Sequence, residues 1–414
     1  MTRPVLIHEP LYGGHHFQYV RVLVEGLQSL GQPLALALAP GASDRDEFKV
    51  HMGDLLSDIQ LTRTVAGPAP PSFKQWRRVA ADLIKITGEL RPQRVILPYT
   101  GGVPAGLGSR LRPWPFHDIP LEGLVMRGAW AYPAGSTKAR LQTQLNLRLL
   151  LRVPWQRLHI LDPLAYFGLT RALGRIPETF RLIPEPVETI APVPPAQARA
   201  QLGLPAEGRW AVVTGAQDER KGSDRLLAAF AAADLPEDAR LLLAGRVSEG
   251  VRRWLNDHGE RWTASGRVCL IDRYLTDQEH DLALNAADFV VAPHVRAVGS
   301  SGLLVRAAAL RKPVLASNFG WIGWATATFG LGRTVDVENP AAYRDAVSAL
   351  YRSPPTLSHA GPDRFAQYHT QANQTAHLLE LTATEAHAQT ASQPLRWEQV
   401  FADVPPPNGD TVRF

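Results

Sequence analysis

Small residues gather in the stretch GSSGLLVRAAALRKPV, residues 299–314, directly before a short apolar helix and a buried strand. Ser300 and Ser301 can cap that helix and donate hydroxyls, while the backbone N–H groups of Gly302 and Leu303 face outward from its first turn. Phosphates bind at such helix ends because the free N–H groups and the helix dipole both favour an anion. A plain serine N-cap would have the same sequence, so the stretch predicts either a phosphate site or an ordinary helix start.

Two adjacent cations follow another predicted strand in VTGAQDERKGSDRLLAAF, residues 213–230. Arg220 and Lys221 supply positive charge, and Gly222 lets the backbone approach a ligand closely, as a diphosphate requires. A solvated charged loop is the alternative interpretation. The position of the loop at the carboxyl end of a strand favours the diphosphate.

A third glycine turn follows the first strand in IHEPLYGGHHFQYV, residues 7–20. Gly13 and Gly14 would let the chain approach a ligand, and His15 and His16 could donate to a phosphate or sugar oxygen. A tight turn with solvent-facing histidines explains the same residues equally well. This turn is therefore a candidate site only in combination with the other two.

The elements around these turns alternate between short apolar runs and helical patterns, which is typical of parallel α/β sheets. In the second half the periodicity predicts helices over 223–233, 248–259, 276–287, 301–311 and 339–353. It predicts strands in the first half over 5–9, 33–39, 94–99, 157–162 and 180–186, and in the second half over 210–216, 240–246, 267–273, 288–294, 312–318 and 332–337. We expect two Rossmann-like domains of the α/β class that face each other across a cleft.

The domain boundaries follow from composition. A proline-rich segment predicts a linker over 185–208, between an amino-terminal Rossmann-like domain over 1–184 and a carboxyl-terminal one over 209–360. A helical segment over 361–390 is expected to pack back on the first domain, and residues 391–414 are expected to form a tail. At 414 residues the chain is long enough for two hydrophobic cores.

Composition excludes several classes of protein. One cysteine, Cys269, rules out an internal disulfide framework and suits a reducing cytoplasm. The net charge of +5 is modest, the sequence has no nucleic-acid signature, and the Asp-x-Asp pair of Asp44 and Asp46 is interpreted as part of a surface loop rather than a metal site. We therefore expect a cytoplasmic protein with no metal, no bound cofactor and no nucleic-acid partner. The basic, leucine-rich segment 136–158 predicts a packing helix, with peripheral membrane contact as the alternative.

These turns, in this order, resemble the GT-B glycosyltransferases, and especially the retaining nucleotide-sugar transferases of glycosyltransferase family 4. The resemblance is strongest from Trp210 to Tyr351, in KGSDRLLAA, LLLAGR, DRYLTDQEHDLALNAADFVVAPH and SSGLLVRAAALRKPVLASNFGWIG. It implies that Lys221 contacts the donor diphosphate, that Gly302 and Leu303 cradle it, and that Gly13 and Gly14 close on the donor. It also implies that the segment Arg273, Tyr274 and Leu275 holds the nucleotide base through backbone groups.

The sequence departs from the family at three positions of the second half, and the family histidine of the amino-terminal domain has no match in DIPLEGLVMRGAW, residues 118–130. Two signature glutamates, expected with seven residues between them, are replaced by Val298 and Arg306, and an expected arginine is replaced by Ala216. The family contacts to the donor sugar and the ribose are therefore not inherited. Arg306 can only donate hydrogen bonds, so it would bind a phosphate or sugar carboxylate, or pair with an acid such as Asp336 or Glu338.

The resemblance implies a sugar transferase that uses a nucleotide diphosphate sugar as co-substrate, acts with retention and needs no metal. Its acceptor would be a glycan, a lipid-linked sugar or a small molecule. Lys221, Arg220 and His15 are the candidate catalytic residues, acting through position and charge. Two alternatives stay open: a catalytically silent GT-B protein that serves as a binding or scaffold subunit, and a nucleotide-sugar epimerase.

Overall fold

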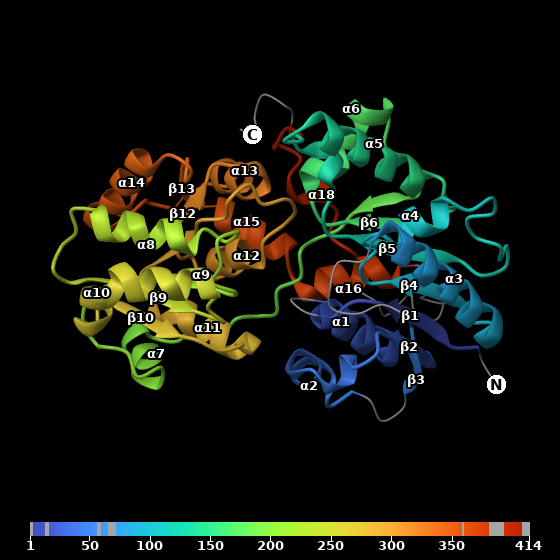
Figure 1. The fold of residues 1–414 in the computed structure, drawn as a ribbon, viewed down its shortest axis with the longest axis horizontal. Helices are drawn as coiled ribbons and strands as arrows, with labels where there is room; N and C mark the ends of the chain where they lie inside the picture. Colours follow the sequence, from blue (N-terminus) through green and yellow to red (C-terminus); the bar gives the residue numbers. More distant parts are fainter. Residues whose placement is uncertain are drawn as a thin grey trace. The chain divides into compact units, whose positions relative to one another are not determined.

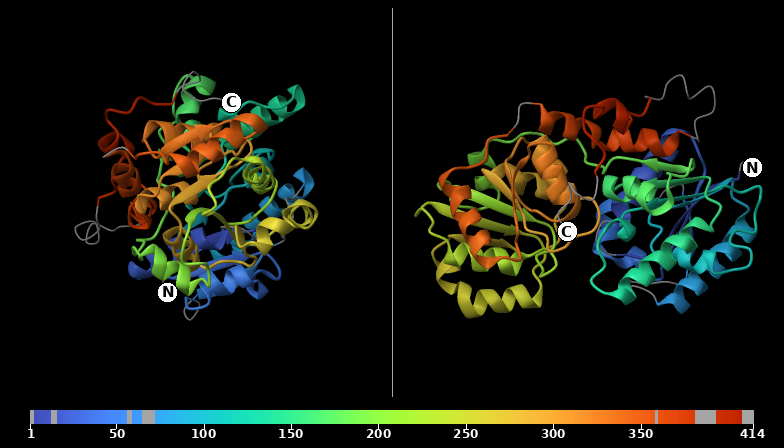
Figure 2. Two further views of the ribbon diagram at one scale, coloured as in Figure 1. Left: turned by 90° about the vertical axis from the view of Figure 1, so that its left-hand side faces the viewer. Right: turned by 90° about the horizontal axis from the view of Figure 1, so that it is seen from above.

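The computed structural model describes residues 3–12, 16–55, 59–64, 72–357, 360–380 and 393–407. The chain divides into two compact units, one of Met1–Ile183 with Ala372–Leu395 and the other of Pro184–Gln371 with Arg396–Phe414. Each unit is built on one parallel sheet that is covered by helices (Figures 1 and 2). The prediction of two Rossmann-like α/β domains is confirmed.

The first unit contains a seven-stranded sheet in the order β3-β2-β1-β4-β5-β6-β7. Its buried strands carry almost uninterrupted apolar residues because helices shield both faces of a parallel sheet. The strands are β1 Val5–Glu9, β2 Leu34–Leu38, β3 Ile59–Arg63, β4 Arg94–Leu97, β5 Leu121–Val125, β6 Arg157–Ile160 and β7 Phe180–Leu182. The helices are α1 His16–Ser29, α2 Asp46–Met52, α3 Phe73–Leu90, α4 Val103–Gly108, α5 Thr137–Leu151, α6 Pro163–Leu173 and α16 Gln371–Leu379, with 3-10 turns at Ala42–Asp44 and Ala129–Ala131.

The second unit contains a six-stranded sheet in the order β10-β9-β8-β11-β12-β13. Its strands are β8 Arg209–Thr214, β9 Ala239–Ala244, β10 Val268–Ile271, β11 Phe289–Ala292, β12 Val314–Ser317 and β13 Gly332–Val335. Its helices are α7 Pro195–Gln201, α8 Ser223–Ala232, α9 Glu249–Trp254, α10 Glu260–Ala264, α11 Asp277–Ala286, α12 Gly302–Ala309, α13 Gly320–Thr328, α14 Pro340–Arg352, α15 Gly361–Tyr368 and α18 Trp397–Val400, with a π-helical stretch at Leu255–Gly259.

All eleven predicted strands form, but two strands of the first unit were not predicted. The strand β5 contains Glu122, which is buried and accepts a hydrogen bond from Arg94 at 2.8 Å. This carboxylate interrupts the apolar run that marks a central strand. The strand β3 lies at the edge of the sheet and exposes Leu61, so it lacks the buried pattern of its neighbours.

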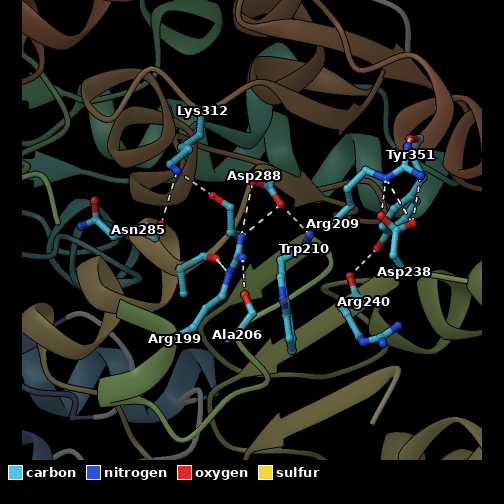
Figure 3. Close-up of polar contacts among 12 residues, drawn as sticks. Arg199, Ala206, Arg209, Trp210, Asp238, Arg240, Asn285, Asp288, Lys312 and Tyr351 are labelled. Atoms are coloured by element: carbon cyan, nitrogen blue, oxygen red, sulfur yellow. Dashed lines mark hydrogen bonds and ion pairs between the residues drawn. The ribbon is translucent and has the colours of Figure 1, made fainter. Parts of the chain in front are cut away.

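The proline-rich segment 185–208 is more ordered than the expected linker. It contains the helix α7, which packs against α11. Arg199 on α7 is buried and donates to the carbonyl oxygens of Ala286 and Ala206, at 2.8 and 2.9 Å (Figure 3). Prolines bound this helix at its start, where a missing N–H costs nothing, so proline enrichment did not prevent it.

Candidate active site

The second sheet has a topological switch point between β8 and β11. From β8 the chain moves outward to β9 and β10, then crosses back to β11 on the other side of β8. The loops that follow β8 and β11 therefore start side by side at the carboxyl end of the sheet and then separate. Open α/β sheets bind their ligands at such a point. Residues 215–222 and 293–301 form these two loops, so two of the three predicted turns meet at this point.

Lys221 lies over the end of β8. Its Nζ atom is 3.6 Å from the position that a Cβ atom of Gly215 would take, so the ammonium group occupies space that a side chain at 215 would fill. Asp218 shapes the loop by accepting a hydrogen bond from the Lys221 backbone N–H at 2.7 Å. Gly222, with a φ of 75°, lets this loop approach the segment after β11 closely. A Cβ atom at position 222 would lie 2.2 Å from the Pro293 carbonyl oxygen, so a larger residue does not fit there.

Arg220 is placed differently from its neighbour. Its side chain is 55% exposed and pairs with Asp218 at 3.4 Å, whereas its carbonyl oxygen accepts from the Val295 N–H at 3.1 Å. The two adjacent cations that were predicted to bind the diphosphate therefore point in different directions. The Lys221 ammonium lies over the end of β8, and the Arg220 guanidinium faces solvent. Lys221 is the better-positioned group for a bound anion.

His294, which sequence reasoning passed over, is buried beside these cations. Its Nδ1 atom has no hydrogen-bond partner among the described residues. Burial, together with the charges of Lys221 and Arg220, lowers the pKa of His294 well below its usual value, so the imidazole is neutral at pH 7. A polar residue two positions after the end of the buried strand β11 was the signal that could have identified it.

The helix α12 begins at this site without a side-chain cap. Ser301 occupies the N-cap position but makes no capping hydrogen bond, and Ser300 Oγ donates to the Glu185 carboxylate instead. The predicted serine cap is therefore wrong. Among the described residues, no acceptor contacts the N–H groups of Gly302 and Leu303. These N–H groups remain available to an anion.

Glu185 is the second residue that sequence reasoning missed. It lies between two prolines in the segment PEP, and its Oε1 atom is 3.8 Å from the position of a Cβ atom at Gly302. The backbone N–H of Glu185 donates to Nδ1 of the buried His369 at 2.9 Å, which fixes this part of the chain. A carboxylate therefore lies at the positive end of α12.

Arg306 forms ion pairs with two acidic residues, neither of which was suggested from the sequence. Its side chain is 7% exposed and pairs with both Asp277 and Asp281 of α11. The suggested pairing with Asp336 or Glu338 is wrong, because Glu338 pairs with Arg296 at 2.7 Å. Burial raises the pKa of Asp281, although Arg306 opposes that shift.

Two further predicted positions are described. The segment Arg273–Leu275 follows β10, the edge strand two positions away from β8 in the same sheet. Arg273 pairs with Glu279 at 2.5 Å, and Leu275 is buried. Val298 is half-buried in the loop before α12.

The first unit has its own switch point, between β1 and β4. The predicted residues Gly13, Gly14 and His15 lie outside the described residues. Beside them, His16 Nδ1 lies 3.2 Å from Oε1 of the buried Glu9, and the His16 ring meets Tyr99 edge-on at 4.7 Å. The other Glu9 oxygen, Oε2, is buried with no hydrogen-bond partner among the described residues.

A cavity of about 330 Å³ opens at the carboxyl ends of β4 and β5 in this unit. Aromatic side chains, a single arginine and two polar residues of α5 line much of it. The aromatic residues are Trp76, Tyr99 and Trp130, the arginine is Arg127, and the residues of α5 are Gln142 and Asn146. Such a lining suits a polar molecule that also presents an apolar face. The residues that line this cavity come from strand ends and helices far apart in sequence, so no local motif predicted it.

The described residues contain neither a metal site nor a helix that could span a membrane. No group of described His, Cys, Asp and Glu residues has the arrangement of a metal site. None of the helices in the described part of the chain is long and apolar enough to cross a membrane.

One family model matches the part of the chain that contains this candidate site. The family model described as glycosyl transferases group 1 matches residues 208–353, which contain both loops and α12. These residues therefore form a glycosyltransferase domain, and the expectation of a glycosyltransferase enzyme is confirmed. No curated protein matches the sequence.

Solved structures share the two-domain architecture. Sucrose-phosphate synthase from Thermosynechococcus elongatus has a TM-score of 0.70 at 20% identity, with 94% of this chain and 100% of that chain covered. Anabaena HepE, solved in complex with UDP, has a TM-score of 0.65 at 14% identity, covering 92% and 99%. WaaG, a glycosyltransferase involved in lipopolysaccharide biosynthesis, has a TM-score of 0.61 at 15% identity, covering 88% and 95%. At these identities the likeness shows the GT-B fold.

Proposed function

We propose that the chain transfers a glycosyl unit from a nucleoside diphosphate sugar that binds at the carboxyl ends of β8 and β11. The observation that carries this proposal is the position of Lys221 over Gly215, at the switch point that also holds the uncapped start of α12. HepE, which shares the fold, binds UDP, so uridine diphosphate is the nucleotide to test first.

In this mechanism the protein acts by position and charge. The Lys221 ammonium and the N–H groups of Gly302 and Leu303 stabilise the negative charge that develops on the departing diphosphate. These groups are fixed before the reaction, so they need little reorganisation as charge develops. The resemblance to glycosyltransferase family 4 supports retention of configuration and a reaction without metal.

We assign the acceptor to the cavity at the ends of β4 and β5. Tyr99 lines this cavity and also contacts His16, which lies against Glu9. The buried Oε2 of Glu9, which has no hydrogen-bond partner in the described part of the chain, can accept a hydrogen bond from a hydroxyl group. Cys269, the single cysteine, is a free thiol, which suits a cytoplasmic site of action.

One observation favours a catalytically silent binding protein as the second candidate. Arg306 replaces a family glutamate and is saturated by Asp277 and Asp281, so position 306 offers a ligand neither a carboxylate nor a free cation. Such a protein would retain nucleotide binding through Lys221 and would lack turnover.

The test is a thermal-shift titration with UDP and UDP-glucose, followed by an assay for released UDP. Lys221→Ala should weaken UDP binding by roughly tenfold to a hundredfold, because a charge-assisted contact contributes about 1.5–3 kcal/mol. Arg220→Gln is the matched control: its exposed side chain should matter much less. UDP binding without turnover on any sugar would favour the silent protein. If Lys221→Ala and Arg220→Gln bind UDP like the wild type, the proposed site is wrong.

A further inference from the structure

The helix α5 carries one exposed face of alternating charge and leucine. Its members are spaced three or four residues apart, so they share one side of the helix. Leu141 and Leu145 are 61% and 49% exposed, although leucine is usually buried. We call this face the basic–leucine stripe: Lys138, Leu141, Leu145, Arg148 and Arg152.

A loop from α4 extends the stripe at its carboxyl end. The Arg152 guanidinium donates to the Arg110 carbonyl oxygen at 3.3 Å, which joins the loop to α5. The next residue, Leu111, is 100% exposed and is followed by the exposed Arg112. Three exposed leucines therefore lie among five cations along one surface.

Acidic residues are absent from the sequence around this surface. Residues 72–81, 98–117 and 126–152 contain no aspartate or glutamate, but they contain ten lysines and arginines: Lys74, Arg77, Arg78, Arg110, Arg112, Arg127, Lys138, Arg140, Arg148 and Arg152. None of these ten forms an ion pair with another described residue. Elsewhere the chain pairs its cations freely, as Arg91 does with Asp118 at 2.6 Å.

We propose that the basic–leucine stripe, with Leu111, docks the protein on a membrane that contains anionic lipid. Cations attract anionic headgroups, and leucines interleaved at helical spacing insert between them. Nucleic acid would be attracted by the cations alone, and its binding would not explain the exposed leucines. A membrane explains both features.

The opposite side of α5 supports this assignment. Gln142, Asn146 and Leu150 line the cavity of the first unit, so one helix separates that cavity from the proposed lipid surface. Docking would bring the cavity beside the headgroups. If the proposed function holds, the acceptor would then be carried by a lipid.

Co-sedimentation of the full chain with vesicles tests the docking without requiring activity. Phosphatidylcholine vesicles with added phosphatidylglycerol should bind the protein, and vesicles of phosphatidylcholine alone should not. Leu141→Gln with Leu145→Gln should weaken binding by roughly tenfold, and Lys138→Gln with Arg148→Gln by roughly thirtyfold, because each cation contributes about 1 kcal/mol. The controls are Leu270→Gln and Arg253→Gln, exposed residues of the other unit that should leave binding unchanged.

Two results would overturn the docking. One is equal binding to both kinds of vesicle. The other is loss of binding in the cation variant while the leucine variant binds like the wild type, which would indicate charge attraction alone, as for nucleic acid. A UDP thermal shift measured on the same variants shows that they are folded. It also separates the two proposals, because UDP binding should persist whether or not the membrane surface does.

Discussion

At the scale of single residues, the carboxylate of Glu185 lies at the start of α12, where the helix would bind an anion. The carboxylate accepts from Ser300 Oγ and lies close to Gly302, at the point where the helix would hold an anion. In the absence of a ligand, a carboxylate at a helix amino terminus is stabilised by the dipole. A diphosphate bound to the same N–H groups would bring further negative charge beside it. If the proposed site holds, Glu185 and the diphosphate compete for it.

Replacing Glu185 should tighten nucleotide binding. Glu185→Gln removes the charge but keeps an oxygen that can accept from Ser300, so the dissociation constant for UDP should fall by roughly tenfold. Isothermal titration calorimetry measures this change directly, and Glu188→Gln, an exposed glutamate of the same segment, is the control. Weaker binding by Glu185→Gln would instead make the carboxylate a contact to the ligand.

At the scale of elements, α7 shows how a segment between domains is fixed. Arg199 donates to two carbonyl oxygens and pairs with Asp288 at 3.3 Å, and Asp288 in turn accepts from the Trp210 N–H of β8 at 2.7 Å (Figure 3). Lys312 completes the network by donating to the Ala287 carbonyl oxygen at 2.6 Å, and burial lowers its pKa. The helix is thus joined to the strand that carries the Lys221 loop.

Loss of this anchor should destabilise the second unit. Arg199→Met leaves the carbonyl oxygen of the buried Ala286 without this donor and Asp288 without its cation, so the free energy of unfolding should fall by about 2–3 kcal/mol. Urea denaturation followed by fluorescence measures the change. Arg344→Met removes an exposed pair with Asp345 and should cost less than about 1 kcal/mol. Equal effects of the two substitutions would show that the α7 network contributes no more than a surface pair.

At the scale of the whole molecule, both units bury neutral histidines. Burial lowers the pKa of His8 to about 4 and of His159 to about 3 in the first unit, and of His369 to about 3 in the second. The unfolded chain binds protons at these residues below about pH 6.5, whereas the folded chain does not until the pH approaches 4 or 3. These three histidines therefore do not destabilise the folded state above about pH 6.5, and they lower its stability as the pH falls from there.

The melting temperature should reflect this difference. Between pH 7 and pH 5 each such histidine should reduce the free energy of unfolding by about 2 kcal/mol. His159→Leu tests whether His159 causes this loss, because both of its ring nitrogens are buried with no hydrogen-bond partner among the residues that the structure describes. This variant should lose less stability on acidification than the wild type, while His117→Gln, at an exposed position, should behave like the wild type. An unchanged pH dependence in His159→Leu would contradict the assignment.

The sequence by itself determined the fold class and the loops that carry the candidate site. Strand and helix periodicity is local, and the glycines and serines at 215–222 and 299–302 are needed wherever a backbone must approach a ligand, so both could be identified without coordinates. Residues that act through long-range contacts could not be identified in this way. Glu185 meets Ser300 across 115 positions of the chain, and Arg306 meets Asp277 across 29.

Only the tertiary structure decided which groups face the site. Arg220 and Lys221 are neighbours in sequence, but one pairs with Asp218 near solvent and the other lies over a strand end. The direction of a side chain depends on the packing of the loop around it, and the partners of a charge depend on which helices the sheet order brings together. These are properties of the folded chain, because they arise from contacts between segments that are distant in sequence.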